Sequence, residues 1–368
     1  MAARRVCMVG GGSFGTAMAR VMASRCGADP TFCSEVAMWV RREEQASEIN
    51  THHTNSQYVG DAVLPPNLVA STALADVVAG ADVVVLAVPH QFLPAVSGEI
   101  RSAIATTHHD AGRRQRVQVC SLLKSFAFDQ ATKEISPLSA SIAGQLGGVD
   151  VSVLMGPNIY REMAADQFAE ATLGYSPGNE AGGELLRQLF TTGLFSVTKC
   201  DDLVGVEMAG ALKNCITLGC GFSTGLGMGM NTKTAIMRVG HAEISRFARE
   251  YFGAQTSTAD EACGMGDLVL SCVVGRGQQL AAAFVVAKGA GQSDVTWEAL
   301  EGDLFQGMKL PDHGNIREVG EFLAARGEAD RFPLLQGIYA IAWEGAEPAS
   351  ILGALRAATA VSAQHRRT

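Results

Sequence analysis

Lys213 and Asn214 lie in the middle of an apolar stretch, VEMAGALKNCITLGCGF (residues 206–222), whose composition predicts a buried helix. The residues one helical turn from Lys213 are alanine, glycine, isoleucine and threonine, so no acidic side chain on the same helix can pair with its ammonium group. Burial of an unpaired ammonium group is costly. Two interpretations are open: the head group reaches water, or it faces a cleft where a ligand and distant residues compensate it. The second interpretation makes Lys213 a candidate for acid/base chemistry.

A glycine-rich segment, VCMVGGGSFGTAMA (residues 6–19), carries Gly10, Gly12 and Gly15 in GxGxxG spacing. In dinucleotide-binding folds the first glycine permits a tight turn, the second lets a pyrophosphate approach, and the third allows close helix packing. The N-terminus of the helix that follows then faces the anionic pyrophosphate. The spacing predicts dinucleotide binding, and a glycine-rich turn without a ligand is the alternative.

Arg41, Arg42 and Glu43 follow the expected second strand. An acidic residue at this place would hold the ribose 2′-hydroxyl of NAD, whereas an arginine would accept the 2′-phosphate of NADP. Both types are present, so this loop does not decide the cofactor. All three residues can also form a solvated charge cluster.

The elements that must position these residues alternate along the first half of the chain. Short apolar strands are expected at residues 5–10, 36–40, 82–88, 117–123 and 151–155, with helical patterns between them such as 14–24 and 91–105. This alternation predicts βαβ units and a parallel sheet. Beyond about residue 200, long Ala- and Gly-rich helical patterns predominate. We therefore expect an α/β, Rossmann-like NAD(P)-binding domain at 1–200 and a mainly α-helical domain at 201–368.

Composition narrows the function further. The chain has 368 residues, is 47% hydrophobic and carries a formal charge of −8, which argues against a nucleic-acid partner. Its nine cysteines show no CxxC pattern, as in intracellular proteins with reduced thiols. No apolar run is expected to reach membrane-spanning length, and the first strand begins too early to leave room for a signal peptide. The histidine pairs His52–His53 and His108–His109 lie in polar stretches, and no metal site is expected.

Several motifs occur in one order along the chain: GGGSFGTA, LPPNLVA, ADVVVLAVPHQFL, SLLKS, VLMGPNI, VEMAGALKN, GLGMGMNTKTAIMRVG, GMGDLVLSC and GRG. Together they resemble the NAD(P)-dependent glycerol-3-phosphate dehydrogenases from about residue 5 to about residue 320. The resemblance implies a dinucleotide-binding domain with an extended sheet, then a helical domain that holds much of the substrate site. It implies NAD as cofactor and the interconversion of dihydroxyacetone phosphate and sn-glycerol 3-phosphate. It also implies a cytoplasmic homodimer.

The resemblance assigns roles to individual residues. Lys213 would be the general acid/base, with Lys124 and Asp267 as further catalytic residues; a helix N-cap is the alternative for Asp267. A ketone reduced by hydride develops alkoxide character, so the site needs a proton donor and fixed positive charge. The substrate contacts would come from Lys124, Asn214, Asp267, Ser271, Arg276 and Gly277. The cofactor contacts would come from Gly10, Gly11, Gly12, Ser13, Phe14, Gly15, Phe92, Lys124, Tyr160, Arg276 and Lys309.

The chain departs from the family pattern at several of these positions. Arg276-Gly277 replaces the usual Arg-Asn, so the asparagine side chain is missing. Tyr160 stands where a small residue is usual, and Pro311 replaces a glutamine on the cofactor side. These departures concern the cofactor and phosphate contacts rather than the reaction.

Two other functions are compatible with parts of the sequence. One is a dehydrogenase of the β-hydroxyacid or 6-phosphogluconate type, which uses a different lysine–asparagine spacing and does not need GDLVLSC. The other is a catalytically silent NAD(H)-sensing module, which would keep the glycine loop but need not keep Lys124, Lys213 and Asp267. All three residues are present.

Overall fold

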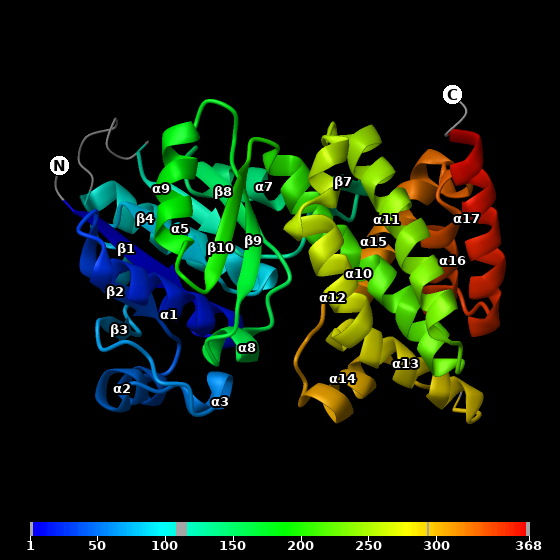
Figure 1. The fold of residues 1–368 in the computed structure, drawn as a ribbon, viewed down its shortest axis with the longest axis horizontal. Coiled ribbons are helices and arrows are strands. Elements are labelled where there is room, and N and C mark those ends of the chain that lie inside the picture. Colours follow the sequence, from blue (N-terminus) through cyan, green and yellow to red (C-terminus); the bar gives the residue numbers. More distant parts are fainter. Residues whose placement is uncertain (1–2, 108–115, 293, 366–368) are drawn as a thin grey trace. The chain divides into compact units, whose positions relative to one another are not determined.

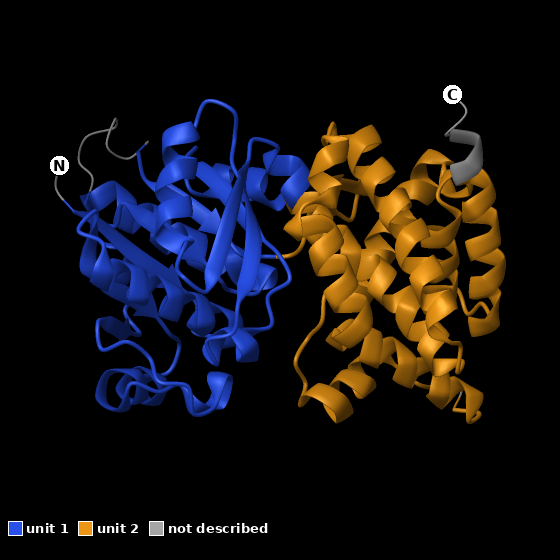
Figure 2. Cartoon of the chain, in the orientation of Figure 1, with its two compact units in different colours: residues 1–123, 138–206 blue, residues 124–137, 207–368 orange. Residues whose placement is uncertain are grey.

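The computed structural model describes residues 3–107, 116–292 and 294–365 (Figure 1). His108 and His109 therefore lie outside the described residues. The chain divides into two compact units (Figure 2). Unit 1 comprises residues 1–123 and 138–206, and unit 2 comprises residues 124–137 and 207–368. The domain boundaries drawn from the sequence stay a prediction, but the units show that the segment after Leu123 packs with the helical part of the chain.

Unit 1 is built on an eight-stranded sheet with the strand order β10-β9-β8-β5-β4-β1-β2-β3. Neighbouring strands are parallel except β8 and β9, which are antiparallel. The strands are β1 (Arg4–Val9), β2 (Phe32–Trp39), β3 (Leu68–Ser71), β4 (Val83–Leu86), β5 (Gln118–Ser121), β8 (Asp150–Met155), β9 (Ala169–Gly174) and β10 (Phe195–Cys200). This α/β architecture confirms the predicted fold class.

The helices of unit 1 form two packed groups, α1 with α8 and α9, and α4 with α5 and α7. They are α1 (Ser13–Ala28), α2 (Glu43–His52), α3 (Ser56–Val59), α4 (Leu74–Val78), α5 (Leu93–Thr107), α7 (Leu138–Gln145), α8 (Tyr160–Ala164) and α9 (Glu180–Phe190), with a short turn at His90–Phe92. The inner strand β1, which lies between β4 and β2, is buried from Val6 to Val9, which explains its continuous apolar run.

The five strands expected from apolar runs are present, with shifted ends. Three further strands of the sheet, β3, β9 and β10, were not expected. β3 has only four residues, and β10 alternates buried and exposed residues as an edge strand does, so neither produces a long apolar run.

Unit 2 is mainly helical, as expected, with one antiparallel hairpin of β6 (Ala127–Asp129) and β7 (Glu134–Ser136). Its helices are α10 (Leu203–Gly225, which begins in unit 1), α11 (Met230–Phe252), α12 (Asp267–Val274), α13 (Arg276–Gly289), α14 (Trp297–Phe305), α15 (Asp312–Arg326), α16 (Pro333–Trp343) and α17 (Ile351–His365). Short helical turns lie at Thr256–Asp260, Ala262–Gly266, Ala329–Arg331 and Pro348–Ser350.

Helix α10 is the buried helix predicted around Lys213. A Cβ on Gly221 would lie 2.5 Å from the carbonyl oxygen of Gln278, so this glycine allows α13 to pack directly against α10. Helix α10 is also 23 residues long and apolar enough to span a membrane by length and composition. This corrects the expectation that no apolar run reaches membrane-spanning length. A bent pair, Ala262–Val274 with Arg276–Gly289, passes the same test when counted together. Because 89% of the apolar window of α10 is buried inside the protein, its properties are those of a core helix.

Candidate active site

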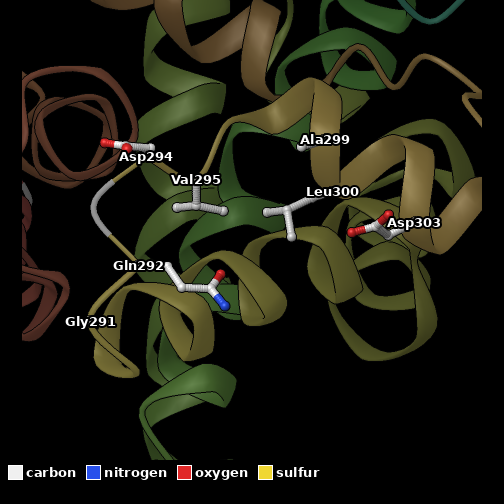
Figure 3. Close-up of a pocket in the computed structure, with 7 residues that line it drawn as sticks. All are labelled: Gly291, Gln292, Asp294, Val295, Ala299, Leu300 and Asp303. Carbon is white, nitrogen blue, oxygen red and sulfur yellow. The ribbon is translucent and has the colours of Figure 1, made fainter.

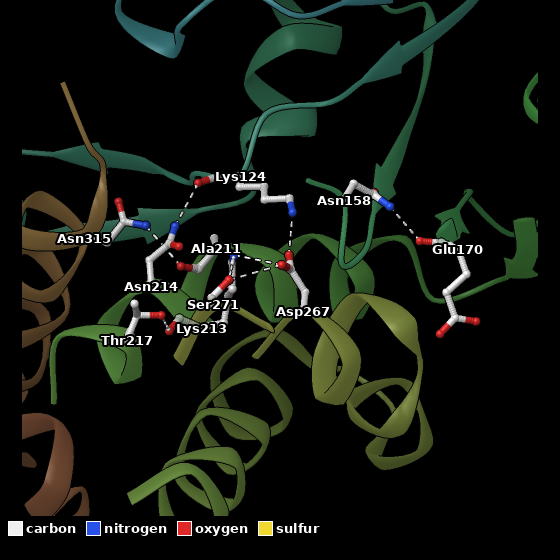
Figure 4. Close-up of polar contacts among 10 residues, drawn as sticks. All are labelled: Lys124, Asn158, Glu170, Ala211, Lys213, Asn214, Thr217, Asp267, Ser271 and Asn315. Carbon is white, nitrogen blue, oxygen red and sulfur yellow. Dashed lines mark hydrogen bonds and ion pairs between the residues drawn. The ribbon is translucent and has the colours of Figure 1, made fainter. Parts of the chain in front are cut away.

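The side chains of Lys124, Lys213 and Asp267 meet in unit 2 (Figure 4). The Asp267 carboxylate accepts from both ammonium groups: Oδ2 lies 2.5 Å from Lys124 Nζ, and Oδ1 lies 2.9 Å from Lys213 Nζ. Lys213 also donates to Ser271 Oγ at 2.5 Å, and Ser271 Oγ lies 3.3 Å from Asp267 Oδ1. The distant partner expected for Lys213 is therefore Asp267, contributed by α12.

Burial makes these contacts strong. The Lys213 side chain is 8% exposed and the Asp267 side chain 2% exposed, so the interpretation in which the Lys213 head group reaches water is wrong. Removing one partner from such a buried pair leaves an uncompensated charge. The N-cap position of α12 is occupied by Gly266, and Asp267 is the first residue within the helix, so the N-cap alternative is also wrong. A π-helical turn, Ala262–Gly266, leads directly into Asp267, and such turns are frequent at functional sites.

The cluster shifts the pKa values of two of its members. Burial lowers the pKa of Lys124 to about 8; the Asp267 carboxylate opposes this change, and the Lys213 ammonium group adds to it. Burial alone would raise the pKa of Asp267, but the two lysines outweigh it and hold that pKa below its usual value. Asp267 is thus an ionised carboxylate that holds two cationic groups beside each other.

Lys124 is held by the hairpin segment that follows it. Asn214 Nδ2 donates to the Lys124 carbonyl oxygen at 3.5 Å. Two ion pairs tie the hairpin to α15: Lys133 Nζ lies 2.8 Å from Glu321 Oε2, and Arg326 Nη2 lies 2.5 Å from Glu134 Oε2. These contacts attach the segment that begins with Lys124 to the helices of unit 2, so Lys124 lies beside α10 and α12.

The remaining predicted residues of unit 2 lie at the start of α13 and in the loop before α15. Arg276 begins α13 and is exposed, and its guanidinium group contacts Met308 Sδ. Gly277 is buried. Lys309 Nζ forms an ion pair with the fully buried Glu301 at 3.0 Å, so Glu301 positions Lys309. Lys309 is thus tied to α14, which carries Glu301.

The glycine loop of unit 1 runs from the end of β1 into α1. Gly10 has a φ of 121°, and a Cβ there would lie 2.7 Å from the Ala87 carbonyl oxygen, so this position requires glycine. A Cβ on Gly12 would meet no atom within 4 Å, so the backbone at the start of α1 is open to a ligand. Ser13 begins α1, and the next residue, Phe14, packs against the core of the unit. A loop open at a helix N-terminus fits the pyrophosphate of a dinucleotide.

A buried polar network behind the glycine loop was not predicted. Gln45 Nε2 donates to the Gly11 carbonyl oxygen at 2.7 Å, and Asn55 Nδ2 donates to Thr16 Oγ1 at 2.8 Å and to the same carbonyl at 3.3 Å. These side chains are buried, and they fix the direction of the Gly11 peptide. Gln45 and Asn55 stand in a polar stretch with no distinguishing spacing, so the sequence carries no signal for them.

The residues expected near the rest of the cofactor also lie in unit 1. The Arg41 guanidinium carbon lies 5.7 Å from the centre of the Phe92 ring, which is 42% exposed. Glu43 accepts a hydrogen bond from Thr72 through one carboxylate oxygen, and further acceptor sites of the carboxylate remain for a ribose hydroxyl. Tyr160 packs partly against the core, and its hydroxyl accepts from Arg161 Nε at 3.0 Å.

A further pocket of unit 2 contains none of the predicted site residues (Figure 3). It is lined by Gly291, Gln292, Asp294, Val295, Ala299, Leu300 and Asp303. Within residues 3–107, 116–292 and 294–365, no group of three or more histidine, cysteine or acidic side chains could hold a metal ion. The lysine–aspartate cluster therefore remains the strongest candidate for chemistry.

Comparison with known proteins matches both halves of the chain to one family. The family model for the N-terminus of NAD-dependent glycerol-3-phosphate dehydrogenase matches residues 5–181, and the model for the C-terminus matches residues 202–353. The chain is 34% identical to the cytoplasmic NAD-dependent glycerol-3-phosphate dehydrogenase of Mus musculus over 352 residues, covering 94% of this chain and 95% of that protein.

Solved structures show the same likeness. Glycerol-3-phosphate dehydrogenase of Saccharomyces cerevisiae superimposes with a TM-score of 0.84 at 32% identity, covering 96% of this chain and 99% of that one. The Plasmodium falciparum enzyme gives a TM-score of 0.87 at 29% identity, covering 96% and 95%. The chain therefore belongs to the NAD-dependent glycerol-3-phosphate dehydrogenase family.

Proposed function

We propose that Lys213 is the general acid/base of the reaction of this family, the NAD(H)-dependent interconversion of dihydroxyacetone phosphate and sn-glycerol 3-phosphate. The observation that carries this assignment is the Asp267 carboxylate, which holds the ammonium groups of Lys124 and Lys213 beside each other in a buried site. NAD, when bound, supplies or accepts the hydride. The side chains of unit 2 handle the proton and the charge.

Lys213 has one N–H group left for the substrate. An ammonium group has three donors, and two of those of Lys213 are taken by Asp267 and Ser271. The third donates its proton to the ketone oxygen as that oxygen becomes an alcohol. In the reverse direction the neutral amine takes the hydroxyl proton, and Asp267 and Ser271 keep Nζ in position throughout.

Lys124 supplies positive charge beside the same oxygen. Preorganised charge in a water-poor site stabilises an oxyanion far more than it would in water. Asp267 fixes Lys124 through the oxygen that Lys213 does not use. Asn214 donates to the Lys124 backbone and so holds this residue beside α10. We also assign Asn214 to substrate binding.

The phosphate of the substrate is assigned to the start of α13. Arg276 is the first residue of that helix, and a guanidinium group can bind phosphate oxygens through two parallel hydrogen bonds. The backbone N–H groups of the first turn, including that of Gly277, add donors at the positive end of the helix dipole. The phosphate is remote from the carbonyl, so its binding energy can orient the reacting end of the molecule.

The NAD contacts are assigned to Gly10–Gly15, Phe92, Lys124, Tyr160, Arg276 and Lys309. The opening at Gly12 is the part of the structure that supports them. We propose NADH over NADPH, on the grounds of family membership and Glu43; Arg41 and Arg42 are the residues that would favour NADPH. We also propose that the protein is a cytoplasmic homodimer, as the family resemblance implies; light scattering on the purified chain measures the subunit count.

The decisive measurement is the initial rate with dihydroxyacetone phosphate, run in parallel with NADH and NADPH. We expect turnover with a higher kcat/KM for NADH. A purified, folded protein that does not oxidise NADH with this substrate would contradict the proposal. A higher kcat/KM with NADPH would keep the reaction and assign the choice of cofactor to Arg41 and Arg42.

A further inference from the structure

Gly277, the second residue of α13, has no room for a side chain. A Cβ on this residue would overlap the carboxyl group of Asp312, which lies over the Gly277 backbone. Asp312 is the first residue of α15 and is only 5% exposed. A buried carboxyl group from α15 therefore fills the volume that a side chain on residue 277 would occupy, directly at the start of α13.

Lys213 and Arg276 lie within electrostatic range of this carboxyl group. Burial raises the pKa of Asp312, and the Lys213 charge, a hydrogen bond from the Asp312 backbone N–H, Arg276 and His313 offset the rise only in part. The ionised form of Asp312 is thus disfavoured although cations lie nearby. Among the described residues, the other titratable groups near it are Cys215 on α10 and Glu301, which contacts His313.

We propose that Asp312 is a specificity-determining residue of the substrate site, and that it binds the substrate phosphate by sharing one proton with it. This inference rests on the proposed function, in which Arg276 at the start of α13 holds the phosphate. Asp312 lies at that helix start and is within range of the Arg276 charge. It stands where the side chain of residue 277 would otherwise complete the phosphate site.

The shared proton follows from charge. Two oxyanions cannot lie at hydrogen-bonding distance unless a proton lies between them, as in carboxylate pairs that retain one proton. A phosphate monoester loses its second proton near pH 6. Above that pH the free ester is a dianion, so the complex takes up one proton from the buffer and forms an O–H···O bond between Asp312 and a phosphate oxygen. Substrate affinity therefore falls as the pH rises.

An amide at position 312 removes this dependence. The side chain of Asp312→Asn has the same shape, and its NH2 group donates to the dianion without proton uptake. Between pH 7.5 and pH 9 we expect the KM of the wild-type enzyme for dihydroxyacetone phosphate to rise up to about tenfold per pH unit relative to that of Asp312→Asn. The two proteins differ only at position 312, so the ratio of their KM values isolates the contribution of this side chain.

Glu318→Gln is the matched control. It neutralises another carboxyl group of α15 whose pKa burial raises to about 7, and it lies outside the proposed phosphate site. We expect its KM to follow the wild-type pH profile. Parallel profiles for wild type and Asp312→Asn, or the same change of slope in both variants, would overturn the proposal.

A second measurement needs no variant. Titration calorimetry of the wild-type protein at pH 8, in two buffers of different ionisation enthalpy, counts the protons taken up on binding. We expect about one proton per glycerol 3-phosphate and a similar uptake with inorganic phosphate. No uptake with either would overturn the role of Asp312. Failure of the wild type to turn over dihydroxyacetone phosphate would contradict the proposed function, whereas the phosphate titration would still decide about Asp312.

Exchange of the two side chains gives a third test. Gly277→Asn alone places a side chain on the Asp312 carboxyl group, and we expect it to raise KM at least tenfold. Gly277→Asn combined with Asp312→Gly moves an amide into the freed volume, and we expect it to recover most of that loss and to show no proton uptake. A double variant as weak as the sum of its single variants would show that the two positions do not share one site.

Discussion

The glycine loop of unit 1 and the lysine cluster of unit 2 represent two ways of building a site. In the loop, the backbone carries the function: Gly10 requires a positive φ, and Gly12 leaves the start of α1 open. In the cluster, side chains carry it: Lys124, Lys213 and Asp267 come from three separate segments and meet through two hydrogen bonds. The loop is encoded within six consecutive residues, whereas the cluster exists only after unit 2 has folded.

This difference predicts how each site responds to mutation. A site built from backbone loses ligand binding when a Cβ is added, because the added atom occupies space that the ligand or the folded chain needs. A charge cluster fails when one member is removed, because the remaining buried charges lose their compensation. The following predictions use that contrast, beginning with the largest expected effect.

Replacement of Lys213 by methionine removes the proton donor and keeps most of the side-chain volume. We expect kcat for dihydroxyacetone phosphate reduction to fall by at least about 10²–10⁴-fold, the usual worth of general acid catalysis. NADH binding, measured by fluorescence, should be retained because the glycine loop lies in unit 1. Lys288→Met, at the far end of α13, is the matched control and should keep full activity. Activity of Lys213→Met within threefold of wild type would remove Lys213 from the mechanism.

The same contrast explains what the sequence could predict. The glycine spacing and the alternating apolar runs predicted the α/β fold and the loop, because both are local patterns. The absence of an acidic partner near Lys213 on its own helix showed only that a distant partner was needed. Asp267 became identifiable through the family resemblance, since no spacing rule connects residues 213 and 267.

Other features left no local signal at all. The Asp312 carboxyl group excludes a side chain at position 277 only because α15 begins beside α13. Gln45 and Asn55 brace Gly11 from a polar stretch that reads as surface. The edge strand β10 has no continuous apolar run, because only one of its faces is buried. Each of these features arises from tertiary packing, so no local sequence pattern predicts it.

Arg276→Ala tests whether the start of α13 recognises the phosphate. A hydrogen bond to a charged group is worth about 1.5–3 kcal/mol, so we expect kcat/KM for dihydroxyacetone phosphate to fall about 10–100-fold. Unphosphorylated dihydroxyacetone should be a poor substrate of the wild type in kcat as well as KM, and the substitution should change that activity little. Equal losses with both substrates would mean that Arg276 serves the cofactor or the fold instead.

Gly12→Ala and Gly10→Ala separate ligand binding from folding at the backbone site. A Cβ on Gly12 meets no protein atom within 4 Å, so we expect the melting temperature to stay unchanged while KM for NADH rises about tenfold. A Cβ on Gly10 would be forced against the Ala87 carbonyl at a φ of 121°. Strain of this kind costs about 1–3 kcal/mol, so Gly10→Ala should lower the melting temperature as well. Unchanged NADH kinetics in Gly12→Ala would place the pyrophosphate elsewhere.

The pH dependence of Lys124 is the smallest expected effect and the sharpest test of the charge cluster. Because burial lowers the pKa of Lys124 to about 8, its ammonium group is charged below that pH and becomes neutral above it. Loss of this charge beside the developing alkoxide should slow ketone reduction severalfold at pH 9. Dihydroxyacetone is the substrate of choice here, because it has no phosphate whose own recognition depends on pH. An arginine cannot be deprotonated in this range, so Lys124→Arg should be slower at neutral pH but show a flatter profile between pH 8 and pH 10. If kcat/KM of both proteins falls with the same slope, the titrating group is not Lys124, and the positive charge that assists the reaction must come from elsewhere in the cluster.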